Sequence, residues 1–201
     1  MTRWDQHRFD RLYSETDDPY GLRSRWYEIR KRSILLAALP RQEYLHAFEP
    51  ACGIGELTRA LAPRCRHIVA SDFSARAVGL ATERCGDLAN VRIERRTLPQ
   101  EWPRPEERFD LVVLSEFGYF LDESDMSSVA RCCDETLTAD GTLVACDWLA
   151  PFDGRRLSTR RVHEVLASIG LPPVACYVDD DFLMSIWCRE PSSVAARDGI
   201  R

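Results

Sequence analysis

The chain has 201 residues, of which 45% are hydrophobic and 29% are charged, so its size and composition suit one globular domain with a full apolar core. Its 32 acidic residues outnumber its 27 lysine and arginine residues, and the net charge of −5 argues against nucleic-acid binding, which needs dense positive charge. No apolar run is long enough to span a membrane and the N-terminus has no apolar signal core, so we expect a cytoplasmic protein.

The chain contains eight cysteines. They form no C-x-x-C pair, two of them are adjacent at 132 and 133, and most lie in apolar runs such as VACDW and SIWCR. Zinc sites need ligands in pairs at short spacing, whereas an isolated thiol in an apolar run behaves as a small hydrophobic group. We therefore expect reduced, structural cysteines and no metal site.

Residues 1–39 predict two helices joined by the polar turn TDDPYGLRS. The second helix, WYEIRKRSILLAAL, has apolar residues at helical spacing and ends before Pro40. We expect this segment to form a lid that excludes water from a site on the remaining domain, residues 40–190. The lid carries aromatic residues that could face that site, namely Tyr13, Tyr20, Trp26 and Tyr27.

Strands and helices alternate after Pro40. The predicted strands are HAFEPA, HIVASD, VRIER, FDLVVLSE and GTLVACDW, and the predicted helices are ELTRALA, SARAVGLATERC, SDMSSVARCCDETL (with a serine cap) and STRRVHEVLASIG. The segments PPVACYV and FLMSIWCR predict an antiparallel pair, and residues 191–201 a frayed, flexible tail. This alternation predicts an α/β fold with a mostly parallel sheet and helices on both faces, which binds ligands beyond the carboxyl ends of its strands.

The stretch FEPACGIGELTRALAP combines a carboxylate, Glu49, with a turn containing Gly53 and Gly55. Asp72 follows Gly55 by 17 residues, close to the ~20 expected for a carboxylate that binds ribose hydroxyls. A dinucleotide fits poorly, because a third glycine is missing at Thr58 and Glu49 would repel a pyrophosphate. A cationic adenosyl ligand, S-adenosylmethionine, satisfies both acids. The alternative is that Glu49 only complements the dipole of the next helix.

The order EPACGIG, ASDFSARAV, FDLVVLSEFGYFL, LTADGTLVACDW resembles the class I S-adenosylmethionine-dependent methyltransferases. The segments DDPYGLRSRWYEIRKRSILLAALP, LPQEWP, VHEVL and DDDFLMSIWCR resemble more narrowly the enzymes similar to nodulation protein S. The resemblance extends to about residue 190. It implies a Rossmann-like, seven-stranded sheet whose last strand is antiparallel, with N-terminal helices that close over the cofactor.

The resemblance also implies roles for single residues. It places Glu49, Gly53 and Gly55 on the first cofactor motif, Asp72 on the ribose and Phe73 beside the adenine. The backbone of Leu98 would meet the adenine ring, and Ser115 and Glu116 would lie near the methionine group. Three positions depart from the family pattern. Ala51 stands where the family often has a glycine, and Asp147 stands where the subgroup is expected to have a histidine. Thr97 replaces the acid that commonly binds the adenine amino group. An alanine at position 51 is tolerable if the backbone there has a negative φ.

Candidate residues for the reaction follow the strands or belong to the lid. Glu116, Asp147 and His163 are candidate general bases; His163 lies within a predicted helix and has a structural role as its alternative. Tyr119 and Tyr20 are candidates for lining the acceptor site. Arg30 could bind the carboxylate of the cofactor and Trp26 could cover it, with solvent exposure of Arg30 and core packing of Trp26 as the alternatives.

The expected activity is transfer of a methyl group from S-adenosylmethionine, with S-adenosylhomocysteine as product. The expected acceptor is a small molecule, an amino sugar or another amine, with no nucleic acid or membrane as partner. An O-methyltransferase of a small metabolite stays open, as does a non-catalytic module that binds either form of the cofactor. A nicotinamide oxidoreductase is disfavoured by Glu49 and Thr58. The oligomeric state is left open.

Overall fold

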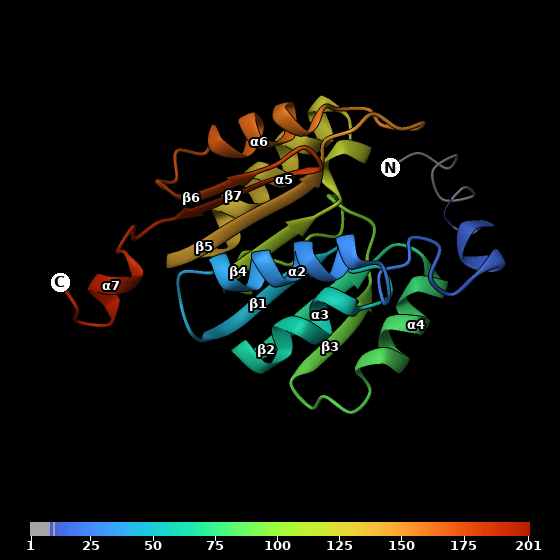
Figure 1. The fold of residues 1–201 in the computed structure, drawn as a ribbon, viewed down its shortest axis with the longest axis horizontal. Coiled ribbons are helices and arrows are strands. Elements are labelled where there is room, and N and C mark those ends of the chain that lie inside the picture. Colours follow the sequence, from blue (N-terminus) through green and yellow to red (C-terminus); the bar gives the residue numbers. More distant parts are fainter. Residues whose placement is uncertain (1–8, 10) are drawn as a thin grey trace.

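The computed structural model describes Phe9 and residues 11–201, and its core is one seven-stranded sheet in the order β3-β2-β1-β4-β5-β7-β6 (Figure 1). The strands are β1 (Tyr44–Pro50), β2 (Cys65–Asp72), β3 (Val91–Arg95), β4 (Phe109–Ser115), β5 (Leu137–Trp148), β6 (Pro173–Val178) and β7 (Phe182–Cys188). Strands β1 to β5 pair in parallel, whereas β7 is antiparallel to both β5 and β6. The predicted Rossmann-like sheet with an antiparallel last strand is confirmed.

Helices cover both faces of the sheet, as Figure 1 shows. The helices are α2 (Trp26–Ala38), α3 (Glu56–Leu61), α4 (Ala75–Cys85), α5 (Glu123–Thr136) and α6 (Thr159–Ala167), with short 3-10 turns η1 (Ala62–Arg64) and η2 (Gly118–Phe120). Buried side chains of α2, α3 and α4 form one core with the sheet, and those of α5 and α6 form a second core on its other face. This arrangement leaves the carboxyl ends of the parallel strands for a site.

Strand β4 lies between β1 and β5 at the centre of the sheet. Its first six residues are all buried, because both faces of the strand are covered by helices. A parallel strand buried on two sides has a continuous apolar run rather than an alternating one, which is what FDLVVLS shows. The exception within the run, Asp110, accepts hydrogen bonds from the backbone N–H groups of Leu45 and His46, both at 2.8 Å, and so fixes the start of β1.

Three local expectations are wrong. Helix α5 is capped by Asp122, whose side chain accepts from the N–H of Asp125, rather than by a serine. Strand β5 begins at Leu137, directly after α5, and not at Gly141. The end of the chain is not without structure either, because Ser193 caps a short helix, α7 (Val194–Arg197).

The predicted lid is described only in part. Residues 11–15 are helical, and α2 ends at Ala38, one residue before the predicted end. The rest of the first predicted helix, residues 1–8 and 10, lies outside the described residues. No helix within the described part of the chain has both the length and the apolar character needed to cross a bilayer.

Candidate cofactor and acceptor site

A cavity of about 620 Å³ lies at the carboxyl ends of β1, β2, β4 and β5, beneath the N-terminal segment and α2. Its volume is within the range of small-molecule sites. Ten of its lining side chains are aromatic. Six are carboxylates and three are cationic: Glu28, Glu49, Glu56, Asp72, Glu116 and Asp181 against Arg25, Lys31 and Arg32. The cavity is therefore acidic and aromatic, which favours a cationic ligand with apolar parts.

The glycine turn after β1 forms one wall. Gly53 has φ of +54°, and a Cβ added there would lie 3.3 Å from the hydroxyl of Tyr13, so only a bare backbone leaves room between the turn and the N-terminal segment. The carboxylate of Asp72 accepts the N–H of Gly53 at 3.1 Å and the N–H of Ser74 at 2.9 Å. Asp72 thus ties the ends of β1 and β2 together, a structural role additional to the expected ribose contact.

Two residues of this turn differ from the arrangement considered in the sequence analysis. Ala51 has φ of +55° and not a negative φ, so it adopts the left-handed conformation that favours glycine. Gly55 does not line the cavity: it begins α3 with φ of +81°, and a Cβ there would lie 3.2 Å from the backbone of Ala81 in α4. The close approach of α4 and the positive φ are a structural reason for a glycine at position 55.

Glu49 provides a test of whether the site fits S-adenosylmethionine. The side chain lines the cavity and is 3% exposed, and its Oε2 atom is buried without a hydrogen-bond partner among the described residues. Burial raises the pKa of this carboxyl to about 8. A buried carboxylate needs a cation or hydrogen-bond donors to compensate for lost water. The ammonium of a bound methionine group supplies both, so the residues present fit the cofactor.

Of the residues expected at the adenine, the structure brings only Phe73, directly after β2, to the cavity. Phe73 lines the cavity, and its ring contacts that of Phe9 edge to face with centroids 5.3 Å apart. Thr97 and Leu98 are not among the lining residues: Thr97 is exposed, with its N–H bonded to the carboxylate of Glu101, and Leu98 is buried in the core. The structure does not bring these two residues to the cavity.

The lid residues divide into two groups. Tyr13, Tyr20 and Tyr27 line the cavity, in agreement with a cover of aromatic side chains. Trp26 is 73% exposed and Arg30 binds Asp179 at 2.7 Å, and neither lines the cavity. The structure does not bring these two side chains to the cavity. Arg25 and Arg32 line the cavity in their place.

Glu116 lies directly after β4 and lines the cavity together with Ser115 and Tyr119. Its φ is +56°, and its two carboxylate oxygens have different partners. Oε1 accepts from Nζ of Lys31 at 2.6 Å; Oε2 accepts from the hydroxyl of Tyr119 and, at 3.2 Å, from the N–H of Trp148. Burial raises the pKa of Glu116, while the charge of Lys31 opposes this effect.

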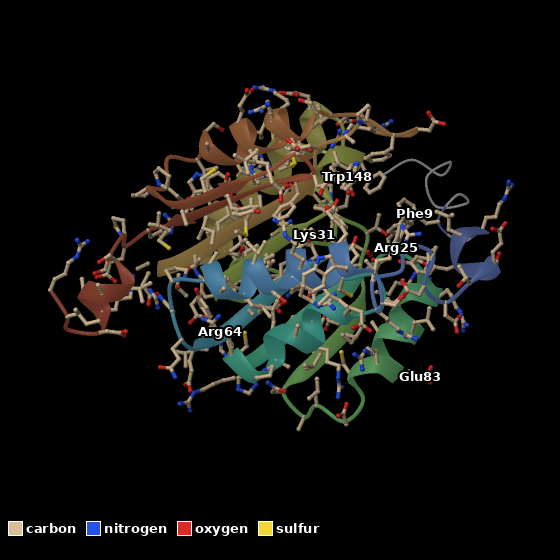
Figure 2. The ribbon with its side chains drawn as sticks, viewed as in Figure 1. Phe9, Arg25, Lys31, Arg64, Glu83 and Trp148 are labelled. Carbon is tan, nitrogen blue, oxygen red and sulfur yellow. The ribbon has the colours of Figure 1, made fainter. Side chains whose placement is uncertain are left out.

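Sequence reasoning missed Lys31, although one signal was available, since it is the only lysine among 27 lysine and arginine residues. Figure 2 shows it on α2, with Trp148 at the end of β5 and with Arg25 and Phe9 nearer the N-terminal helix. Burial lowers the pKa of Lys31, but the carboxylates of Glu116 and Glu28 outweigh burial and hold the pKa above its usual range. Lys31 is therefore a permanent cation and not a base.

Asp147 and His163 form a separate buried pair. Nε2 of His163 lies 3.1 Å from Oδ2 of Asp147, and Nδ1 lies 2.9 Å from the hydroxyl of Ser185 on β7. Neither Asp147 nor His163 lines the cavity, so the structure does not bring these two candidate bases to the site. The described residues contain no group of three or more histidine, cysteine, aspartate and glutamate side chains arranged to hold a metal ion.

Comparison with known proteins shows which family and which solved structures this chain resembles. The family described as methyltransferase domain matches residues 47–141. A crystal structure from Pseudomonas syringae, assigned as a methyltransferase, is 40% identical with a TM-score of 0.72 over 82% of this chain and 99% of that one. The N-methyltransferase NodS from Bradyrhizobium japonicum WM9, in complex with S-adenosyl-L-homocysteine, is 22% identical with a TM-score of 0.81 over 91% of this chain and 97% of that one. None of the curated proteins compared matches the chain in sequence.

The fold and the cavity define a class I methyltransferase: a sheet with an antiparallel last strand, a glycine turn after β1 and acids at the ends of β1 and β2. The 40% sequence identity to the Pseudomonas protein shows membership of the same family, which a similar fold alone would not show. The chain belongs to the S-adenosylmethionine-dependent methyltransferases, with NodS among its structural neighbours.

Proposed function

We propose that this enzyme transfers a methyl group from S-adenosylmethionine to the nitrogen of a small acceptor, an amine or an amino sugar. The observation that carries the proposal is Glu116, a half-buried carboxylate directly after β4 that lines an acidic, aromatic cavity. Such a cavity attracts ammonium groups through charge and through cation–π contacts. The N-methyltransferase activity printed for NodS supports the proposal by analogy of fold only.

Glu49, Gly53 and Asp72 would hold the cofactor, with Phe73 at its adenine. The cofactor supplies an electrophilic methyl group on a sulfonium. The protein therefore contributes alignment and exclusion of water, and alignment alone can supply roughly 7–11 kcal/mol of the barrier. Tyr13, Tyr20 and Tyr27 in the cavity lining would exclude water on the lid side.

An alkylamine acceptor must lose a proton before its lone pair can react. With a pKa near ~10.4, freeing the lone pair at pH 7 costs about 4.6 kcal/mol. Lys31 and Tyr119 are held protonated, because the pKa of each lies above its usual range. Within the cluster of Lys31, Tyr119 and Glu116, the carboxylate of Glu116 is thus the group able to accept a proton. A positioned general base contributes about 10²- to 10⁴-fold to the rate.

The test is transfer of labelled methyl groups from S-adenosylmethionine to amines, amino sugars and matched alcohols. We expect amines to react, and Glu116→Gln to lower turnover by about 10²-fold or more while the affinity for S-adenosylhomocysteine changes little. Glu135→Gln, an exposed change on α5, is the matched control. Transfer to alcohols alone would replace this proposal by O-methylation. Binding of S-adenosylhomocysteine without transfer to any acceptor would indicate a binding module.

The cysteines bear on where the enzyme works. All eight are free thiols in the structure. Disulfides persist in oxidising compartments, whereas thiols are kept reduced in the cytosol. We therefore place the proposed activity in the cytoplasm, a location that fractionation with antibodies against the chain would test.

A further inference from the structure

Lys31 is unusual among the cations of this chain. The other 26 cationic residues are arginines, and Lys31 is only 5% exposed. Its Nζ atom lies 2.6 Å from Oε1 of Glu116, 3.0 Å from Oε2 of Glu28 and 4.8 Å from the ring centroid of Tyr27. A buried ammonium is costly unless its donors are satisfied, and here both carboxylates and the ring face provide that compensation.

The geometry suits the compact ammonium of a lysine. An ammonium is a compact charge with three donors that can point to different partners, whereas a guanidinium is a planar fork that fits one carboxylate edge-on. Lys31 binds two carboxylates from different elements, Glu28 on its own helix and Glu116 after β4. At the surface Arg161 bridges two carboxylates in a similar way, Glu164 on its own helix and Glu123 on α5, so what distinguishes Lys31 is that it does so while buried.

Lys31 completes the set of contacts that fixes Glu116. Oε2 of Glu116 is held by Tyr119 and Trp148, but Oε1 is held by Lys31. The remaining charged or titratable groups around Glu116 belong to three elements. They are Glu28 and Tyr27 on α2, Tyr119 on η2, and Cys146 and Asp147 on β5. A further cation, Arg155, lies over the ring of Tyr119 with its Cζ atom 5.0 Å from the centroid, but Lys31 is the cation that bonds directly to the carboxylate of Glu116.

We propose that Lys31 is a positioning residue, which holds Glu116 ionised and oriented toward the acceptor. Because Lys31 lies on α2, the proposed base is then ionised only while α2 is packed against the sheet. This inference rests on the proposed function of Glu116. The acceptor proton passes to the carboxylate of Glu116, while Lys31 keeps its own protons and changes no bond. An α2 that moves away from the sheet removes the counter-charge and so leaves Glu116 protonated and inactive.

The experiment compares Lys31→Met, Lys31→Arg and Lys31→Ala with the wild-type enzyme. The control is Arg41→Met, which removes a half-buried cation that pairs with Asp140 at the other end of the sheet. For Lys31→Met we expect the acid limb of kcat/KM against pH to move upward by about 1–3 pH units, because an opposite charge at this distance lowers a carboxyl pKa by that amount. Arg41→Met should leave the limb unmoved.

Two further variants separate charge from geometry. Lys31→Arg keeps the charge, so its acid limb should stay at the wild-type pH while kcat falls. Lys31→Ala should regain activity when ethylammonium is added, with the methylated acceptor identified by mass so that methylated ethylamine is not counted. If Lys31→Met does not fold, these two variants decide the question.

A readout independent of turnover is the titration of Glu116 by carbon NMR in protein with labelled glutamate, assigned by the signal lost in Glu116→Gln. An upward shift of this titration in Lys31→Ala supports the inference. An unmoved titration and acid limb, or a tenfold loss of S-adenosylhomocysteine affinity as the main effect, would overturn it and make Lys31 a cofactor contact or a structural cation. If Glu116→Gln itself left turnover unchanged, the proposed function of Glu116 would fail instead.

Discussion

The buried carboxyl of Glu49 makes cofactor affinity depend on pH. Its pKa is raised by burial to about 8, so at pH 7 most of the ligand-free protein carries a neutral carboxyl. Ionising it to pair with a ligand ammonium then costs about 1.4 kcal/mol, since one pKa unit corresponds to about 1.36 kcal/mol. We expect the Kd of S-adenosylhomocysteine to fall about tenfold between pH 6 and pH 7, where one proton is released per ligand bound. The Kd should then level off above about pH 8, where the free carboxyl is already ionised.

The measurement is calorimetry in buffers that differ in ionisation enthalpy, which counts the protons released on binding. Glu49→Gln cannot titrate, so it should release no proton through this position and bind more weakly, with an affinity that changes little between pH 7 and pH 8; below pH 7 Asp72, whose pKa burial raises to about 6, still titrates. Glu135→Gln on the surface of α5 should behave as wild type. Equal proton release by wild type and Glu49→Gln, or a wild-type Kd that does not change between pH 6 and pH 8, would refute the pairing of Glu49 with a cation.

The same carboxyl has a second consequence, for folding. A carboxyl whose pKa is raised in the folded state favours folding below its unfolded pKa of 4.5, and this contribution is lost as pH rises through about 8. The full loss is on the order of 5 kcal/mol, and a bound cation offsets it. Glu49→Gln should therefore raise the Tm of the ligand-free protein at pH 8 and abolish most of its extra stabilisation by ligand.

Three further predictions concern single side chains. Asp72→Ala should weaken S-adenosylhomocysteine binding by ~1.5–3 kcal/mol in calorimetry and also lower Tm, because the N–H groups of Gly53 and Ser74 lose their acceptor; unchanged affinity would remove Asp72 from the site. Ala51→Gly should raise Tm by about 2–4 °C, since relief of a left-handed φ exceeds the entropy cost of glycine by up to about 1 kcal/mol, and a lower Tm would contradict the strain. His163→Ala should lower Tm by roughly 4–10 °C through the loss of the partner of Asp147, with kcat/KM nearly unchanged. A collapse of kcat/KM at unchanged Tm would instead restore His163 as a candidate base.

The fold could be predicted from the sequence because its signals are local or repeat along the chain. The apolar run of β4 indicates a strand buried on both faces, and VRIER is recovered as β3 with the same bounds. The cap of α5 was harder to predict, because DESDMSS offers three N-cap residue types close together, Asp122, Ser124 and Asp125. Only the path of the chain out of η2 selects Asp122.

The conformation of Ala51 could not be predicted from its neighbours. Alanine disfavours positive φ, so the local sequence predicts the opposite sign. The turn is fixed from a distance, by Asp72 holding the N–H of Gly53 and by the backbone of Ser71 accepting the N–H of Cys52 at 2.9 Å. Strain of this kind is tolerated where the surroundings impose it, and here it occurs on the wall of the cofactor cavity.

The errors on α2 have one cause, the phase of the helix. Trp26 and Arg30 were expected at the cofactor, and as an i, i+4 pair they lie on the same side of the helix. Tyr27 and Lys31 form the adjacent i, i+4 pair, turned by about 100°, and both line the cavity together with Glu28, Arg32 and Leu35 of the same helix.

An apolar pattern can define that phase only when it occupies one side, and on α2 it does not. The run Ile34, Leu35 and Leu36 is continuous, and only Leu35 among the three is fully buried. The phase is instead set by polar contacts with distant elements, Arg30 with Asp179 and Lys31 with Glu116. A lysine placed once among 26 arginines was therefore a better guide to the site than the aromatic and basic residues beside it, because the chain uses arginine wherever a generic cation suffices.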